Sequence, residues 1–336
     1  MKAVAYQKAG AIHLDDALVD IEIDSPVAHG HDLLVRVQAV SVNPVDTKIR
    51  NNKNAEDQQW KILGWDAVGV VEAIGEQVTQ FKTGDQVWYA GALDRPGSNS
   101  ELQLVDERIV GHKPKSLNAS QAAALPLTAI TAWEMLFDRL QVPRTAAENT
   151  SILIIGGAGG VGSITIQLLK QLTNLTIIST ASRPETAEWV KQLGADYVLD
   201  HRQALAPQMQ QLGLSAPLYV FSTTQTGQHL ADIAELIAAQ GHFGLIDDPE
   251  KLDIKPFKSK SVSVHWEFMF TRSMYQTDDM SQQSQLLNQV AHLVDQGKIK
   301  TTVTQVLSPI NAENLKRVHQ QIESGTTKGK IVLHRF

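Results

Sequence analysis

The sequence contains no cysteine among its 336 residues. Disulfide bonds, thiolate nucleophiles and cysteine-ligated metals are therefore excluded. No apolar run approaches the ~18–20 residues of a membrane-spanning helix, and the first residues, MKAVAYQKAG, lack the apolar stretch of a secretory signal. These absences favour a cytoplasmic protein without a membrane partner. The net charge of −6 indicates no nucleic-acid partner.

Motifs of two other enzyme classes are also missing. The 11 histidines form no HExxH pattern or other metal-ligand spacing, and the chain has no GxSxG elbow. Neither a histidine-based metal site nor a serine-hydrolase site is therefore indicated.

The length exceeds what one hydrophobic core usually serves, which predicts two domains. The first third has short β-branched or alternating apolar segments punctuated by glycine and aspartate, which predicts an antiparallel, barrel-like domain. The segment Ser120–Leu136 looks helical on both sides of Pro126. Beyond Ser151, strand and helix candidates alternate, which predicts a parallel sheet covered on both faces. A helix from Ser284 to near Gly297 and a short strand at Lys330–Leu333 close the chain. The strand candidates are Leu33–Val42, Val68–Ile74, Gln86–Tyr89, Glu101–Val105, Ile152–Ile155, Thr176–Thr180, Tyr197–Leu199, Leu218–Phe221, His242–Ile246 and Val262–Phe268, and the helices among the later ones are Ile164–Leu172, Glu185–Leu193 and His229–Ala239.

The strongest motif is SILIIGGAGGVGSITIQLLK at residues 151–170. An apolar strand leads into Gly157-x-Gly159-x-x-Gly162, and an amphipathic helix follows. The first glycine allows a tight turn, the second allows a pyrophosphate to approach the backbone, and the third brings the helix close to the strand. The N-terminus of that helix favours phosphate groups. The motif predicts dinucleotide binding; the alternative is a glycine-rich turn used only for packing.

The end of the next strand indicates which dinucleotide binds. An NAD site usually has an acidic residue there, whereas this chain has Ala181-Ser182-Arg183-Pro184. A hydroxyl and a guanidinium suit the 2′-phosphate of NADP(H). His201-Arg202, after the third strand, supplies a second candidate polar contact. The alternative for Arg183 is a solvated charge at a helix start.

The whole chain resembles the medium-chain dehydrogenase/reductase superfamily. The segment GWDAVGVVEAIGEQVTQFKTGDQVWY (64–89) is similar to its N-terminal domain. The segments SVNPVDTKIR (41–50), ASRPET (181–186) and KSVSVHWEFMFTRSMYQT (260–277) look like the branch labelled zinc-type alcohol-dehydrogenase-like or quinone oxidoreductase. The resemblance implies an α/β plus β fold. A GroES-like catalytic domain would span 1–126 and 271–336, and a Rossmann NADPH-binding domain with a doubly wound parallel sheet would span 127–270.

This chain lacks the residues that bind the zinc named in that label. Zinc alcohol dehydrogenases place a Cys where Asn43 stands, a His-Glu pair where Trp65-Asp66 stands, and a second Cys around 127–131. A tetrahedral nitrogen and sulfur site is not available here. Alcohol oxidation needs such a Lewis acid or a strong base. We therefore expect hydride donation from NADPH to a quinone or an α,β-unsaturated carbonyl, which spreads the developing charge onto its own oxygen.

Four residues are candidates on the catalytic side. By analogy with metal-free relatives, Asn43 would donate a hydrogen bond to a substrate oxygen; the alternative is a turn residue before Pro44. Asp46 would hold the local loop by hydrogen bonds. Lys48 stands where many quinone oxidoreductases have Tyr, and would stabilise an anion or be solvated. Trp65 would form a wall of the pocket or belong to the core.

The remaining candidates concern the cofactor. The resemblance places Thr128 near the nicotinamide carboxamide and Lys330 near the cofactor, with a charge in a β-turn as the alternative for Lys330. Phe221, Ser222 and Leu245-Ile246 end the fourth and fifth strands, where cofactor crevices form. The cofactor-binding candidates are Thr128, Gly157, Gly159, Gly160, Val161, Gly162, Ser182, Arg183, His201, Phe221, Leu245 and Lys330.

Two other functions stay open, a zinc alcohol dehydrogenase and a non-enzymatic NADPH-binding protein. A homodimer is expected, because strand 262–270 would leave an open sheet edge that relatives pair across a two-fold axis. The loops expected at Asn51–Gln59 and Ala92–Asn99 would shape the substrate pocket.

Overall fold

The computed structural model describes residues 1–57 and 59–336 and divides into two compact units. The first unit comprises Met1–Ile130 and Phe270–Phe336, and the second comprises Thr131–Met269. The first boundary falls inside helix α3 (Pro126–Trp133), which continues directly into a π-helical turn, η2 (Glu134–Arg139). The chain therefore passes from one unit to the other within a continuous helical segment.

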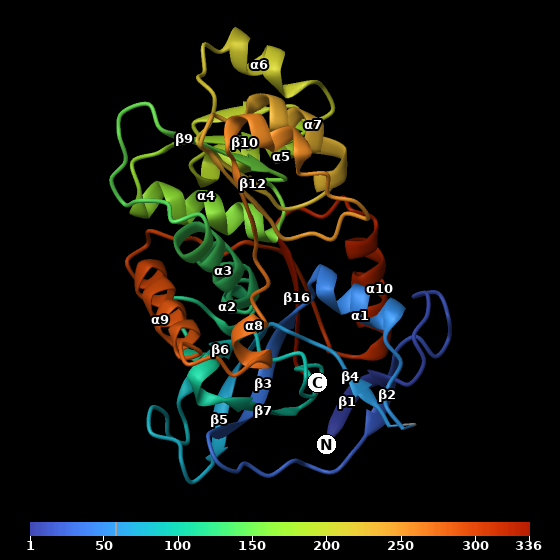
Figure 1. Ribbon diagram of the computed structural model, residues 1–336. Helices are drawn as coiled ribbons and strands as arrows, with labels where there is room; N and C mark the ends of the chain where they lie inside the picture. The colour runs from blue at the N-terminus through green and yellow to red at the C-terminus, as the bar shows by residue number, and fades with distance from the viewer. Residues whose placement is uncertain (58) are drawn as a thin grey trace. The chain divides into compact units, whose positions relative to one another are not determined.

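The second unit is built on a parallel sheet of six strands within its described residues (Figure 1). Their order is β11-β10-β9-β12-β13-β14, the order typical of doubly wound dinucleotide-binding domains. All five residues of β9 are buried, which explains the apolar run that follows Ser151. The expected Rossmann architecture is confirmed. The strands are β9 (Ser151–Ile155), β10 (Thr176–Thr180), β11 (Tyr197–Leu199), β12 (Tyr219–Ser222), β13 (His242–Leu245) and β14 (Ser263–Trp266).

Helices cover both faces of this sheet. Helices α4 (Gly160–Leu172) and α5 (Pro184–Leu193) pack together, and the Trp189 indole donates a hydrogen bond to Ser163 Oγ at 2.9 Å. A core cluster joins the sheet to three further helical segments through side chains such as Met209, Ile233 and Phe257. These segments are α6 (Leu205–Gln211), α7 (Thr226–Leu236) and the 3₁₀ helix η3 (Lys255–Lys260).

The first unit contains mostly antiparallel sheet, as the sequence predicts for a GroES-like domain. Its larger sheet runs β15-β16-β3-β5-β6-β8, with β7 also paired to β3, and a small sheet runs β2-β1-β4. Strand β3 is central, because it pairs with β5, β7 and β16. The strands are β1 (Lys2–Tyr6), β2 (Val19–Glu22), β3 (Asp32–Ser41), β4 (Lys61–Ile62), β5 (Ala67–Ile74), β6 (Gln86–Tyr89), β7 (Leu102–Asp106), β8 (Val110–His112), β15 (Val303–Leu307) and β16 (Lys330–His334).

Helix α1 corrects the loop expected around Asp46 and Lys48. It follows β3 and begins with Pro44, whose fixed φ suits the first helical position. At its start the Asp46 carboxylate accepts the Asn43 main-chain N–H, and the Asp46 N–H donates to the Asn43 main-chain carbonyl. The helix extends into the expected loop at Asn51–Gln59, of which Gln58 lies outside the described residues. The helices of this unit are α1 (Pro44–Asn52), the 3₁₀ helix η1 (Glu107–Ile109), α2 (Ala119–Ala122), α8 (Thr271–Met274), α9 (Gln282–Asp295) and α10 (Ala312–Glu323).

Helix α10 was not predicted, and it packs against α1. Its sequence AENLKRVHQQIE has few apolar residues, and its buried face includes His319. Leu315, Val318 and Ile322 nevertheless recur at helical spacing, so the sequence holds a signal that could have predicted this helix. Among the residues that the structure describes, no helix is both long enough and apolar enough to cross a membrane.

Candidate active site

The glycine motif forms the turn between β9 and α4. Gly156, one residue before the predicted motif, has a φ of +79°, a left-handed conformation that favours glycine. The tight turn assigned to Gly157 is therefore made at Gly156, a correction that the double glycine in the sequence permits. Gly157 instead allows close packing, because an added Cβ would clash with Ser179 Oγ on β10.

The next two glycines differ in their surroundings. An added Cβ at Gly159 would meet only the Gly156 carbonyl oxygen, at 3.6 Å, so the space beside Gly159 is open. At Gly162 it would lie 2.5 Å from Gly157 Cα, so Gly162 lets α4 approach the turn, as expected. Gly159 is the N-cap of α4, and Gly160 and Val161 begin the helix. Because the first N–H groups of a helix have no partner within it, this turn fits a pyrophosphate.

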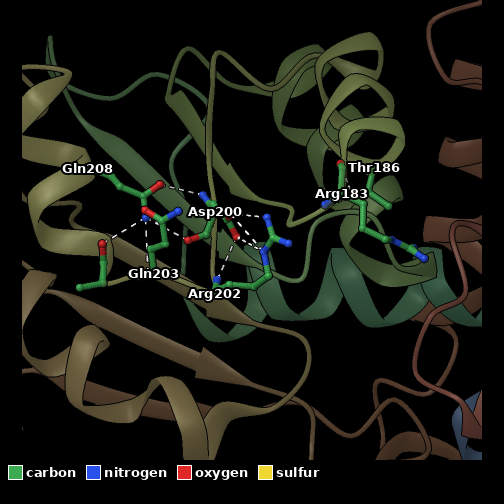
Figure 2. A network of polar contacts seen from close by, with 7 residues as sticks. Arg183, Thr186, Asp200, Arg202, Gln203 and Gln208 are labelled. Atoms are coloured by element: carbon green, nitrogen blue, oxygen red, sulfur yellow. Dashed lines mark hydrogen bonds and ion pairs between the residues drawn. The ribbon is translucent and has the colours of Figure 1, made fainter.

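Ser182 and Arg183 follow β10, and both are half-buried. The Arg183 N–H donates to Thr186 Oγ1 at 3.1 Å, and the Thr186 hydroxyl donates to the Arg183 carbonyl at 2.9 Å. The Arg183 side chain is 40% exposed and lies 3.1 Å from Glu185 Oε1. In Figure 2 it extends away from Asp200. A partly exposed guanidinium thus stands where NAD sites have an acid.

The end of β11 carries the second polar group. Arg202 is held by Asp200, with Nη2 2.7 Å from Oδ2 (Figure 2), and these bonds lower the pKa of Asp200 to about 2. His201 turns toward β10, and its Nδ1 lies 3.1 Å from Thr180 Oγ1. Burial, reinforced by His229, lowers the pKa of His201. Thr180 Oγ1 also accepts a hydrogen bond from the Gly156 N–H at 3.0 Å. His201 is therefore tied to the glycine turn.

Phe221 and Leu245 are at the carboxyl ends of β12 and β13, as expected, and both are fully buried. Ser222, beside Phe221, is also buried, and its Oγ accepts a hydrogen bond from Thr226 Oγ1 at 2.8 Å. Their side chains belong to the core of the second unit, and a contact with the cofactor stays a prediction.

In the first unit, three candidate residues lie within one buried cluster. The Asn43 Nδ2 group donates to Asp66 Oδ2 at 2.8 Å and to the Trp65 carbonyl at 3.2 Å. The ammonium of Lys330, on β16, donates to Asn43 Oδ1 and lies 3.1 Å from Asp66 Oδ2. The Asp46 carboxylate accepts the Asn43 main-chain N–H at 2.7 Å. The Lys330 side chain is only 4% exposed, so the alternative of a charge in a β-turn is wrong.

The two carboxyl groups of this cluster are fully buried. Asp66 Oδ1 accepts the Leu127 main-chain N–H at 2.7 Å. Burial raises the pKa of Asp66, and the Lys330 ammonium opposes that shift. Burial also raises the pKa of Asp46 to about 7. Asp66 is the partner of Lys330 that the sequence alone did not reveal, because 264 positions separate the two.

The other candidates on this unit lie differently. Lys48 is exposed on α1, apart from the buried cluster. Trp65 is buried, its indole donates to the Ala92 carbonyl at 3.0 Å, and its ring meets Phe270 edge to face. The Thr128 hydroxyl, in the first turn of α3, donates to the carbonyl of Leu125, just before the helix, at 3.0 Å. Trp65 thus has the contacts of a core aromatic residue, and its role as a pocket wall stays a prediction.

The cluster does not fit the zinc of the resembling alcohol dehydrogenases. The Trp65 indole has no free lone pair for a metal, and the Asn43 oxygen already accepts a hydrogen bond from the Lys330 ammonium. In residues 1–57 and 59–336, no group of three or more His, Cys, Asp or Glu side chains is placed to hold a metal ion.

Two family profiles match the chain. The profile of the alcohol dehydrogenase GroES-like domain matches residues 29–115, and that of zinc-binding dehydrogenases matches residues 193–333. A zinc-type alcohol dehydrogenase-like protein of Staphylococcus epidermidis (strain ATCC 12228 / FDA PCI 1200) is 39% identical over 337 residues. The alignment covers 99% of each chain.

Two solved structures with similar folds differ widely in their sequence identity to this chain. A crystal structure from Rhizobium etli CFN 42, assigned to the zinc-dependent alcohol dehydrogenases, is 57% identical with a TM-score of 0.97, covering 100% of this chain and 98% of that one. The Escherichia coli quinone oxidoreductase complexed with NADPH is 21% identical with a TM-score of 0.83, covering 99% of this chain and 100% of that one. The second likeness shows a shared fold.

Proposed function

Because the chain belongs to the zinc-type alcohol dehydrogenase-like family of the medium-chain dehydrogenase/reductase superfamily, we propose that it is an NADPH-dependent reductase of quinones or α,β-unsaturated carbonyls. The observation that carries this proposal is the cluster of Asn43, Asp66 and Lys330, with Trp65 beside it, in the place of a zinc site. An oxidoreductase without that Lewis acid is suited to acceptors that stabilise negative charge by themselves.

The second unit supports the choice of cofactor. The N–H groups of Gly160 and Val161 would hold the pyrophosphate, and Arg183 with Ser182 would hold the 2′-phosphate. The E. coli quinone oxidoreductase of the same fold was crystallised with NADPH. Bound NADPH supplies a hydride, that is, two electrons and one proton. The added proton that completes reduction of the acceptor would come from solvent.

The first unit would orient the acceptor, and the polar groups of its buried cluster would stay fixed. Both Asn43 amide hydrogens are donated within the protein, so Asn43 can bond a substrate oxygen only if one of these bonds is exchanged. The buried Asp46 carboxylate is used at the start of α1, which favours a structural role over proton transfer. A self-stabilised quinol or enolate anion needs little further assistance.

The proposal is tested by NADPH oxidation with 1,4-benzoquinone, 9,10-phenanthrenequinone and short 2-alkenals. We expect turnover above the enzyme-free rate for at least one acceptor, with NADPH preferred over NADH. Tight NADPH binding without turnover of any acceptor would instead favour a non-enzymatic NADPH-binding protein. Alcohol oxidation that a chelator abolishes would refute the metal-free reading.

A further inference from the structure

The ammonium of Lys330 lies inside the first unit and is surrounded by oxygen atoms. It donates to the Val42 carbonyl at 3.1 Å and to Asn43 Oδ1, and it lies 3.1 Å from Asp66 Oδ2. An ammonium has three N–H donors, and here three oxygen partners match them. The side chain is only 4% exposed, so this charge is compensated by the protein and not by solvent.

By the resemblance, two of the three partners stand at positions that belong to the metal site of zinc alcohol dehydrogenases. Asn43 replaces a cysteine and Asp66 replaces the carboxylate of a His-Glu pair. We propose that the Lys330 ammonium is a built-in substitute for the metal cation: it neutralises Asp66, orients the Asn43 amide and keeps divalent cations out of this cluster. The family name refers to zinc, but the residues of this cluster do not fit zinc. The Lys330 ammonium explains why, because it supplies the positive charge in place of a metal ion.

The orientation of Asn43 follows from the charges on either side. Its carbonyl oxygen faces the Lys330 ammonium, and its Nδ2 group faces the Asp66 carboxylate at 2.8 Å. A reversed amide would place its oxygen against a carboxylate oxygen and its NH₂ group against the ammonium. Lys330 is therefore a positioning residue for Asn43, and in the proposed reductase it would act through that amide.

Exclusion of metal follows from the same contacts. A divalent ion bound by Asn43 Oδ1 and Asp66 Oδ2 would compete for the two oxygens that Lys330 occupies and would be repelled by its charge. Without Lys330, the cluster would present two side-chain oxygens and the Val42 carbonyl. Oxygen ligands of this kind suit a hard cation such as Mn²⁺.

The test compares Mn²⁺ and Zn²⁺ binding to the full-length wild type, Lys330→Met, Lys330→Arg and a Lys298→Met control at an exposed lysine of the same unit. We expect no stoichiometric binding by wild type, Lys330→Arg or the control, and at least about tenfold tighter binding of one ion by Lys330→Met. The gain should disappear in Lys330→Met/Asp66→Asn. Unchanged binding by Lys330→Met, or an Asp66-dependent metal site in the wild type, would overturn the proposal.

A second measurement covers the case in which Lys330→Met folds poorly. Chemical unfolding of Lys330→Met, Asp66→Asn and the double variant measures the coupling of the two charges. We expect the double variant to be more stable than Lys330→Met, because it no longer buries an unpaired carboxylate. A double variant no more stable than Lys330→Met would contradict the proposed neutralisation. Both measurements are independent of enzyme activity, so they distinguish this inference from the proposed reductase function.

Discussion

Two glycines of the same turn should separate cofactor affinity from stability. Gly159→Ala adds a methyl group beside open space, so we expect a melting temperature close to that of the wild type and at least about tenfold weaker NADPH binding, because the methyl group obstructs the pyrophosphate. Gly162→Ala places the same group 2.6 Å from the Gly156 carbonyl oxygen and should lower stability by about 1–3 kcal/mol. Thermal unfolding and calorimetric titration measure both effects. Equal NADPH affinity in Gly159→Ala and wild type would argue against the phosphate site.

Arg183 and Arg202 form a matched pair at the proposed 2′-phosphate site. Arg183→Ala should weaken NADPH binding about tenfold or more and leave NADH binding almost unchanged, because only NADPH carries the phosphate. Arg202→Ala should change NADPH binding much less, because its guanidinium is already held by Asp200. Calorimetric titration of both variants with NADPH and with NADH measures these changes in affinity. A loss of NADH affinity as large as that of NADPH would show that Arg183 does not select the phosphate.

Helices α1 and α10 pack together through a buried arginine and histidine. Arg50 Nε donates to His319 Nδ1 at 3.3 Å, and Arg50 also forms an ion pair with Glu323. Burial, with a smaller effect of Arg50, lowers the pKa of His319 to about 3. His319 is therefore neutral in the folded protein across the physiological range, whereas in the unfolded chain its pKa is about 6.5.

This pKa difference predicts how stability depends on pH. Below pH ~6.5 His319 binds a proton in the unfolded chain but not in the folded protein. As the pH falls, the contribution of His319 to the free energy of unfolding therefore decreases by about 1.4 kcal/mol per pH unit, which amounts to about 2 kcal/mol at pH 5. His319→Gln should lose this slope, and His13→Gln, at an exposed site, should keep it. Asp46, with its pKa raised to about 7, titrates in the opposite sense, so the slopes of the variants must be compared. The free energy of unfolding is measured with urea at several pH values. The same dependence on pH for wild type and His319→Gln would refute the assignment.

At the scale of the whole molecule, we propose a homodimer formed through the edge of the parallel sheet. Strand β14 ends that sheet, and Trp266 and Phe268 are 53% and 49% exposed there. An open edge with large apolar side chains favours pairing with a second copy. We expect Trp266→Glu/Phe268→Glu to shift light-scattering mass from dimer to monomer, and Tyr197→Glu, at the opposite edge strand β11, to leave the dimer intact. A monomeric wild type at micromolar concentration would contradict this proposal.

Local patterns were sufficient to predict much of the fold. The strands β10 and β11 have the predicted bounds, and β9 begins one residue earlier than predicted. A buried parallel strand is rich in apolar and β-branched residues, so its position can be recognised from a few neighbouring residues. The short helix α1 was not predicted, because polar residues such as Asp46 and Arg50 occupy its buried face, and their burial depends on partners that are distant in the sequence. Helix α10 was also not predicted, although Leu315, Val318 and Ile322 recur at helical spacing.

The sequence by itself determined the class of this protein: a glycine motif after an apolar strand, an arginine in place of an acid, and no cysteine to bind zinc. These are properties of residue type and short spacing. Only the tertiary structure decided that the tight turn is at Gly156 and that Lys330 meets Asn43 and Asp66. The reason is physical: the compensation of a buried charge depends on which distant strands are brought together, and a local pattern does not record that.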